Sequence, residues 1–146
     1  MVNLRVEGSA WVPTPEDTPY QRVGGSQAVT ALVEAFYDSM EVHEPQLAKL
    51  HALDDQGKVS RASRDRFALF LIGWLGGPQT YTETHGHPRL RMRHARVAIE
   101  GSLRDAWTRT MARAMDERGV EPQVKAYLTT RFAEVADFLR NAPEAG

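Results

Sequence analysis

The sequence predicts an all-α fold, and two observations lead to this prediction. Apolar residues recur at intervals of three and four along the segments 26–40, 60–75, 100–117 and 121–141, which is the spacing of one buried helix face. No stretch alternates apolar and polar residues over several positions, and no Asn-Gly pair marks a hairpin turn. We therefore expect helices packed around one core.

Local signals set the expected start and end of each helix. Ser26 and Ser60 are expected N-caps, and Pro88 and Pro122 suit the first turn of a helix. Gly76-Gly77-Pro78 should end the second helix, and a loop is expected from Gln79 to His85. The residues expected to face the core are Val29, Leu32, Val33, Phe36, Tyr37, Met40, Phe67, Phe70, Leu71, Trp74, Leu103, Trp107, Met111, Ala114, Met115, Val124, Leu128, Phe132, Val135, Ala136 and Leu139.

Composition narrows the class of protein. The chain has 146 residues, of which 42% are hydrophobic and 25% charged, as expected for one globular domain. A net charge of −1 gives no overall attraction to nucleic acid or to an anionic membrane, and no apolar run approaches the roughly 18 residues that span a bilayer. No basic segment followed by an apolar stretch indicates a secretory signal, so we expect a cytoplasmic protein.

The domain is expected to span residues 20–142. Residues 1–19 form a polar extension in which three prolines forbid a continuous helix. We expect a partly disordered tail, although the apolar residues Val2, Leu4, Val6 and Trp11 could hold it on the domain surface. Residues 143–146 are expected to form a short tail.

Two aromatic residues would bring polar atoms into the core. The helical spacing turns Tyr37 inward, so its phenol needs a partner there, and the same holds for the indole N–H of Trp107. A buried donor without an acceptor costs about 1–3 kcal/mol. His51 lies in a short segment whose pattern does not decide between surface and core.

The run Gly86-His87-Pro88-Arg89-Leu90-Arg91-Met92-Arg93-His94 is the most informative stretch. A helix that begins at Pro88 places Leu90 and His94 on one face, so that His94 looks inward beside apolar neighbours. A single inward histidine is more often a hydrogen-bonded core residue than a metal ligand. With no cysteine in the chain, any metal must be held by histidine, by carboxylates or by a cofactor's own nitrogens.

Two other interpretations of this region are weaker. Four arginines at 89, 91, 93 and 96 suggest a nucleic-acid surface, but the run is short, no aromatic residues interleave it, and the net charge is negative. A zinc site built from His85, His87 and His94 would lack the i, i+4 spacing that helical zinc ligands favour.

A family resemblance decides between these possibilities. Gly76-Gly77-Pro78, Tyr81, the run ending in His94 and then Arg104-Asp105-Ala106-Trp107 resemble, in order and spacing, the group II truncated haemoglobins, over about residues 18–142. The resemblance implies a truncated globin fold, a two-over-two helical sandwich around a haem. It also implies haem b as cofactor, with His94 as the proximal iron ligand.

The resemblance further assigns roles around the haem. The distal, ligand-binding side is expected to consist of Tyr37, His51, Ser63, Phe67 and Trp107. Arg66, Tyr81 and Arg93 are expected to bind the propionates, since an arginine fork pairs with a carboxylate through two hydrogen bonds, and Leu90 to contact the cofactor beside His94.

The resemblance implies a protein that binds O2, NO and CO. A distal side with several hydrogen-bond donors predicts high O2 affinity and slow release, which suits NO detoxification or peroxide chemistry better than oxygen transport. Whether the protein is an enzyme, such as an NO dioxygenase or a peroxidase, is left open. A reductase partner is expected, and either a monomer or a homodimer. The alternative is a haem-free helical binding or regulatory module.

Overall fold

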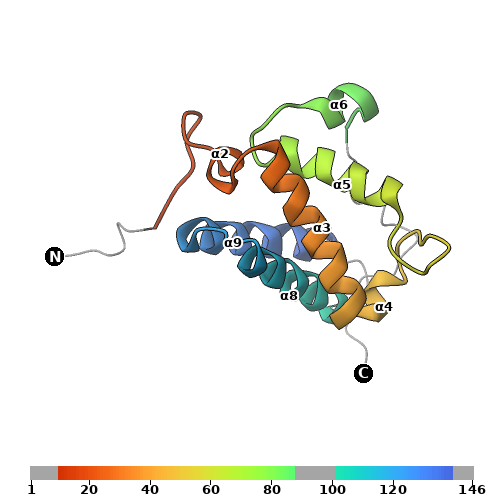
Figure 1. Ribbon diagram of the computed structural model, residues 1–146. Coiled ribbons are helices and arrows are strands. Elements are labelled where there is room, and N and C mark those ends of the chain that lie inside the picture. The colour runs from red at the N-terminus through yellow and green to blue at the C-terminus, as the bar shows by residue number, and fades with distance from the viewer. Residues whose placement is uncertain (1–9, 88–100, 140–146) are drawn as a thin grey trace.

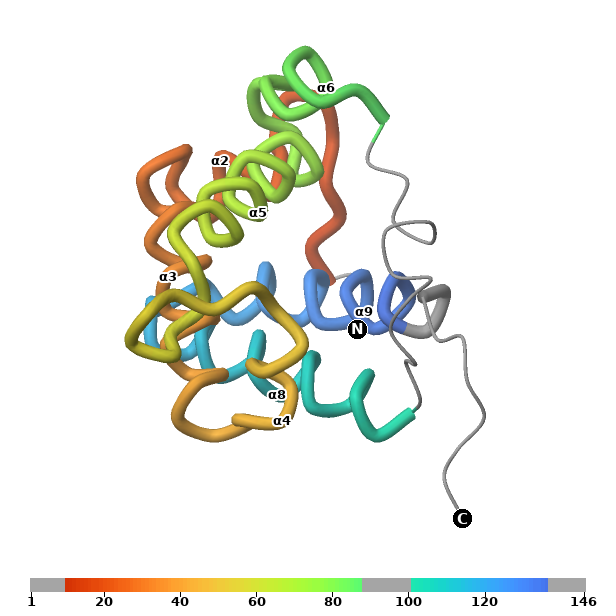
Figure 2. Tube along the Cα trace, turned by 90° about the vertical axis from the view of Figure 1, so that its right-hand side faces the viewer, coloured from red at the N-terminus to blue at the C-terminus, as the bar shows by residue number. Residues whose placement is uncertain are grey.

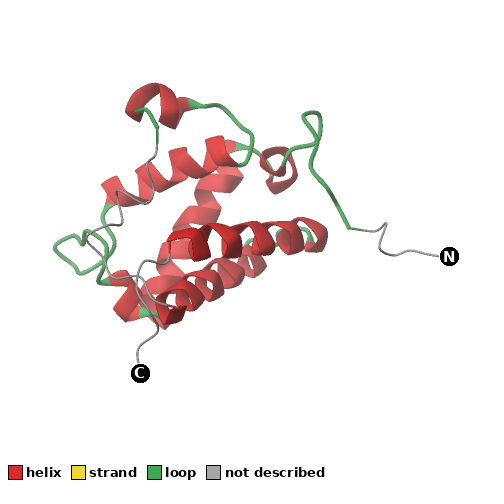
Figure 3. Cartoon of the chain, turned by 180° about the vertical axis from the view of Figure 1, so that it is seen from behind, coloured by secondary structure: helices red, strands yellow, loops and turns green. Residues whose placement is uncertain are grey.

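The computed structural model describes residues 10–87 and 101–139 of the chain (Figure 1). Within these ranges there is no strand, only isolated bridges at Thr14–Asp17 and Leu53–Val59, and Figure 3 shows helices joined by loops. The prediction of an all-α fold is confirmed. The helices are α2 (Pro19–Val23), α3 (Ser26–His43), α4 (Pro45–Ala48), α5 (Arg61–Trp74), α6 (Thr80–His85), α8 (Gly101–Glu117) and α9 (Pro122–Leu139).

The long helices pack as two pairs. Helices α8 and α9 lie side by side in both views (Figures 1 and 2), and α3 contacts both α5 and α8. The sandwich forms because each helix turns one apolar stripe toward the centre, and all six apolar positions expected in α3 are buried. The largest fully buried side chains are Phe36, Leu32, Met40, Leu71, Leu75, Met111, Met115, Leu128, Val29, Val33, Val59 and Val124.

The two serine caps have different outcomes. Ser60 caps α5 as predicted, because its Oγ accepts a hydrogen bond from the Ser63 backbone N–H at 3.2 Å. The prediction for Ser26 is wrong: Gly25, with φ at +88°, is the N-cap, and Ser26 is already helical. The Ser26 hydroxyl lies 2.9 Å from the Tyr20 hydroxyl, so a tertiary hydrogen bond replaces the expected local one.

The segment before α3 is more ordered than an extended polar lead. Thr18 and Gln21 form a capping box that starts α2, and the Tyr20 N–H donates to the Leu75 carbonyl at 2.9 Å. Trp11 packs edge-on against Tyr127 of α9 with ring centroids 5.3 Å apart, and its Nε1 donates to Asp17. Trp11 therefore holds residues 10–19 on the domain.

The expected loop at Gln79–His85 is also wrong, because residues Thr80–His85 form α6. A single short turn has no apolar periodicity to predict it, and it depends on tertiary contacts. Here the Tyr81 ring is buried against Phe70 of α5, and the Gln79 side chain donates to the carbonyls of Gly73 and Gly77.

Some expectations fall on residues that the structure does not describe. The helix expected at Pro88 and both chain ends, 1–9 and 140–146, lie outside the described residues. None of the helices in the two described ranges is long and apolar enough to cross a membrane.

Gly77 gives a test of the packing between α2 and the end of α5. A Cβ at Gly77 would lie 2.5 Å from the Tyr20 ring, which is fixed by its bond to Ser26. We expect Gly77→Ala to lower the free energy of unfolding by about 1–3 kcal/mol in urea titrations. Gly73→Ala is the matched control: its Cβ meets only the flexible Gln79 side chain and the Pro78 carbonyl, at 3.4 Å or more, so equal losses in both variants would contradict this account.

Candidate functional site

An aromatic cluster forms where α3 crosses α5 and α8. The ring centroid of Phe36 on α3 lies 5.0 Å from that of Tyr37, 5.6 Å from Phe67 on α5 and 5.2 Å from Trp107 on α8. Phe36 is fully buried, whereas Phe67 and Trp107 are only half-buried. One side of the cluster is therefore closed within the core. On the other side, the described residues leave part of the apolar ring surface uncovered.

Tyr37 lies inside this cluster, as its helical position predicts. It is 5% exposed, and its ring centroid is 5.9 Å from Phe67 and 5.5 Å from His51. Burial raises the pKa of the Tyr37 phenol, and the cation of Arg64 opposes part of that rise. Tyr37 is therefore a neutral hydroxyl donor at physiological pH.

Two donors of the cluster find no acceptor among the described residues. In the part of the chain that the structure describes, neither the Tyr37 hydroxyl nor the Trp107 indole N–H forms a hydrogen bond with another residue. The acceptor that a buried Trp107 N–H needs is thus not found among the described residues. Both rings contact Phe36 and Phe67, so the two donors belong to one site.

His51 joins the site at its edge. It is half-buried, and its Nδ1 lies 3.1 Å from the Leu47 carbonyl oxygen. A carbonyl only accepts, so Nδ1 carries the proton in this contact. The His51 ring contacts that of Tyr37, so the structure brings this expected distal residue to the edge of the cluster.

The two α5 residues of the expected distal side differ in their surroundings. Phe67 touches Phe36, Tyr37 and Trp107, and so lies at the centre of the cluster. Ser63, one turn earlier, is half-buried and takes part in the cap of α5 through its contact with Ser60. The structure thus brings Phe67 together with Tyr37 and Trp107.

The residues expected at the cofactor edge are only partly described. Arg66 is exposed on α5, and Tyr81 is buried on α6, with its ring 4.9 Å from that of His85. His94, Leu90 and Arg93 lie outside the described residues, so their roles stay predictions. His85 and His87 form no group of three metal ligands within the described part of the chain.

Sequence reasoning missed Arg64. Its side chain is 6% exposed, and it bonds three carboxylates of α3 next to Tyr37. In the sequence, Arg64 is surrounded by the charged residues Arg61, Asp65 and Arg66, so it would be taken for another solvent-exposed charge. A signal did exist, since Glu34, Asp38 and Glu41 share a face of α3 at i, i+4 and i+7.

Comparison with known proteins identifies the fold. The sequence profile of the family described as "Bacterial-like globin" matches residues 18–141. A group 2 truncated haemoglobin, YjbI of Bacillus subtilis, is 35% identical over 129 residues, which cover 88% of this chain and 92% of that protein. The chain is therefore a bacterial-like globin of the group II truncated haemoglobins.

Comparison with solved structures leads to the same family. The crystal structure of the group II truncated haemoglobin from Bacillus anthracis has a TM-score of 0.77 at 34% identity, covering 87% of this chain and 98% of that one. The cold-adapted truncated haemoglobin from the Antarctic marine bacterium Pseudoalteromonas haloplanktis TAC125 gives 0.77 at 35% identity, covering 85% and 98%. The two-over-two sandwich is thus the truncated globin fold, and globins bind diatomic gases through haem.

The described residues fit such a cofactor. A flat apolar macrocycle needs ring surface that the protein core does not cover, and Phe67 and Trp107 supply it. A globin iron is held by the macrocycle and one protein ligand. A group of three protein ligands, which the described residues do not contain, is not required.

The raised pKa of Tyr37 gives a prediction for the protein itself. In an absorbance titration at 295 nm, we expect the Tyr37 phenol to ionise only above pH 10, because burial raises its pKa. The pKa of Tyr37 is higher in the folded chain than in the unfolded chain. The contribution of the neutral phenol to the free energy of unfolding is therefore complete below pH 10 and is lost as the pH rises further. Tyr37→Phe should remove absorbance change above pH 10, and an unchanged titration curve in that range would contradict the raised pKa of Tyr37.

Proposed function

We propose that this globin binds haem b through His94 and holds O2 with high affinity and slow release. One observation carries the proposal: Tyr37 and Trp107, whose donors find no acceptor among the described residues, come from two helices and contact the same two rings, Phe36 and Phe67. Donors placed in advance around a small polar ligand stabilise it without reorganisation at the moment of binding. Their arrangement favours a ligand with partial negative charge.

The bound haem supplies an iron with one coordination position open to O2, NO or CO. His94 would hold the iron from the proximal side, and Leu90 would pack against the macrocycle. Arg93, Arg66 and Tyr81 would bind the propionates through charge-assisted hydrogen bonds. Arg66 is exposed, so its contribution is screened by water and modest.

On the distal side, each residue has a separate task. The Trp107 N–H donates to the ligand, and Tyr37 donates either to the ligand or to His51 Nε2. Phe67 limits the space beside them, and a small Ser63 leaves the entrance open. A hydrogen bond to a partly charged ligand contributes about 1.5–3 kcal/mol, so even one donor slows release considerably.

Slow release favours chemistry over delivery. A carrier must give up its ligand, whereas a globin that retains O2 gives time for NO to react with it or for peroxide to be turned over. We therefore propose NO detoxification or peroxide chemistry, carried out in the cytoplasm and supported by a reductase that restores the ferrous state. Absorption spectra of the purified oxidised, reduced and CO-treated protein separate this proposal from a haem-free helical module.

The proximal ligand is tested by substitution at His94. His94→Ala is expected to remove most of the intense Soret absorption, or to leave a loosely held haem whose spectrum free imidazole restores. His87→Ala is the matched control on the same run and should keep the wild-type spectrum. An unchanged spectrum in the His94 variant would place the iron ligand elsewhere.

The distal donors are tested at Trp107. Trp107→Phe keeps most of the ring contacts but deletes the N–H, so we expect O2 release to accelerate by about three- to a hundredfold. The measurement is stopped-flow displacement of O2 by CO, alongside NO consumption by the oxygenated protein. Trp74→Phe removes an indole that stacks on Phe132 away from Tyr37 and serves as the control. A wild-type off-rate that is already fast and does not respond to Trp107 would refute tight binding.

A further inference from the structure

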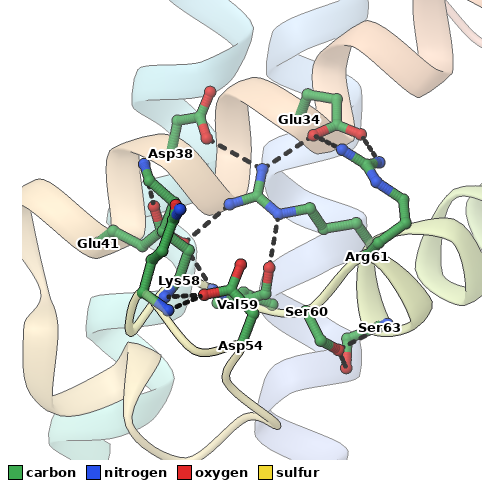
Figure 4. A network of polar contacts seen from close by, with 11 residues as sticks. Glu34, Asp38, Glu41, Asp54, Lys58, Val59, Ser60, Arg61 and Ser63 are labelled. Atoms are coloured by element: carbon green, nitrogen blue, oxygen red, sulfur yellow. Dashed lines mark hydrogen bonds and ion pairs between the residues drawn. The ribbon is translucent and has the colours of Figure 1, made fainter.

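Arg64 is a buried cation at the junction of α5, α3 and the loop before α5. Its Nη1 donates to Glu34 at 2.8 Å and to Asp38 at 2.9 Å, and its Nη2 donates to Glu41 at 2.8 Å. Its Nε donates to the Val59 carbonyl at 3.0 Å. Figure 4 shows Glu34, Asp38 and Glu41 facing the Val59–Ser60 segment across this junction. Every nitrogen of the guanidinium is therefore engaged, which fixes its position.

The same guanidinium lies over the ring of Tyr37. Its central carbon is 5.6 Å from the Tyr37 ring centroid, within the range of a cation–π contact. Tyr37 also contacts Phe67 and His51, both expected on the distal side. Tyr37 thus contacts both a fixed cation and the residues of the candidate ligand pocket.

A role in packing the two helices does not by itself explain this arrangement. Burying a charged network costs desolvation energy, and well-packed apolar side chains often close such a junction equally well. Arg61, one turn earlier on α5, also pairs with Glu34, but it is exposed and bridges to Asp65 instead of covering a ring. Arg64 alone among these arginines joins the carboxylates of α3 to the Tyr37 ring.

We propose that Arg64 is a positioning residue for the distal pocket, which fixes the Tyr37 ring and strengthens its hydroxyl as a hydrogen-bond donor. A cation over the ring face draws electron density from the phenol and so polarises its O–H bond. The surrounding carboxylates hold the cation in place without touching the ligand. This inference rests on the proposed function in so far as Tyr37 serves a ligand.

The test compares substitutions at two arginines of the same helix. Arg64→Met removes the cation but keeps an unbranched side chain, and Arg64→Lys keeps the charge but loses the planar fork that binds three carboxylates. Arg61→Met and Arg61→Lys are the matched controls, because Arg61 shares Glu34 but does not contact Tyr37. Each of these four variants is also made in combination with Tyr37→Phe.

The first measurement needs no cofactor. In the full chain labelled with tyrosine carrying 13C at the phenolic carbon, Tyr37 is assigned by the signal that Tyr37→Phe removes. We expect Arg64→Met to shift this signal, Arg64→Lys to shift it less, and both Arg61 variants to leave it in place. If Arg64→Met does not fold, the test compares the Tyr37 signal of Arg64→Lys with that of Arg61→Lys, and only the first should be shifted. An unmoved signal in the Arg64 variants overturns the proposal.

The second measurement uses the haem-loaded protein. Arg64→Met should speed O2 release by about three- to tenfold and shift the C–O stretching frequency of the CO complex, and neither effect should appear in the Tyr37→Phe background. Equal effects with and without the Tyr37 hydroxyl would show a general structural role and overturn the inference. If the wild type takes up no haem, the proposed function fails, and the labelled-tyrosine measurement still decides the role of Arg64.

Discussion

The contact of Phe36 with three other aromatic rings is the constraint on which the site depends. Phe36 is fully buried on α3, and its ring touches Tyr37, Phe67 of α5 and Trp107 of α8. Aromatic pairs prefer edge-to-face geometry, so one ring in contact with three neighbours sets the distance and the tilt of the helices that carry them. The same crossing that closes the core thus brings the Tyr37 hydroxyl and the Trp107 indole to one place.

The fold followed from the sequence wherever a helix carries its own periodic stripe. Val29, Leu32, Val33 and Met40 recur at helical spacing, and all are buried, because the stripe of α3 determines which face meets α5 and α8. Helix α6 has no such stripe. It exists because Tyr81 is buried against Phe70, a contact between segments that no local pattern contains.

Caps show the same division between local and tertiary control. Ser60 and Ser26 both precede an apolar stripe, but only Ser60 acts as an N-cap. Ser26 bonds the Tyr20 hydroxyl, and a glycine with positive φ starts α3 in its place. In the site, helical spacing predicted that Tyr37 faces inward, whereas the distal roles of Tyr37, Phe67 and Trp107 came from the family motif. The burial of Arg64 needed knowledge of which helices are neighbours.

The buried arginine links stability and chemistry through one side chain. Desolvation opposes the charged form of Arg64, and its hydrogen bonds to Glu34 and Asp38 outweigh that cost, so its pKa is raised and it stays charged. The Val59 N–H also donates to Glu41, at 2.6 Å, so the loop before α5 is held by the same carboxylate. An apolar side chain at position 64 could fill the space between α3 and α5, but it would remove the one cation that these three carboxylates share and the cation over the Tyr37 ring. The junction that fixes helix α5 against α3 therefore also places a positive charge over the Tyr37 ring.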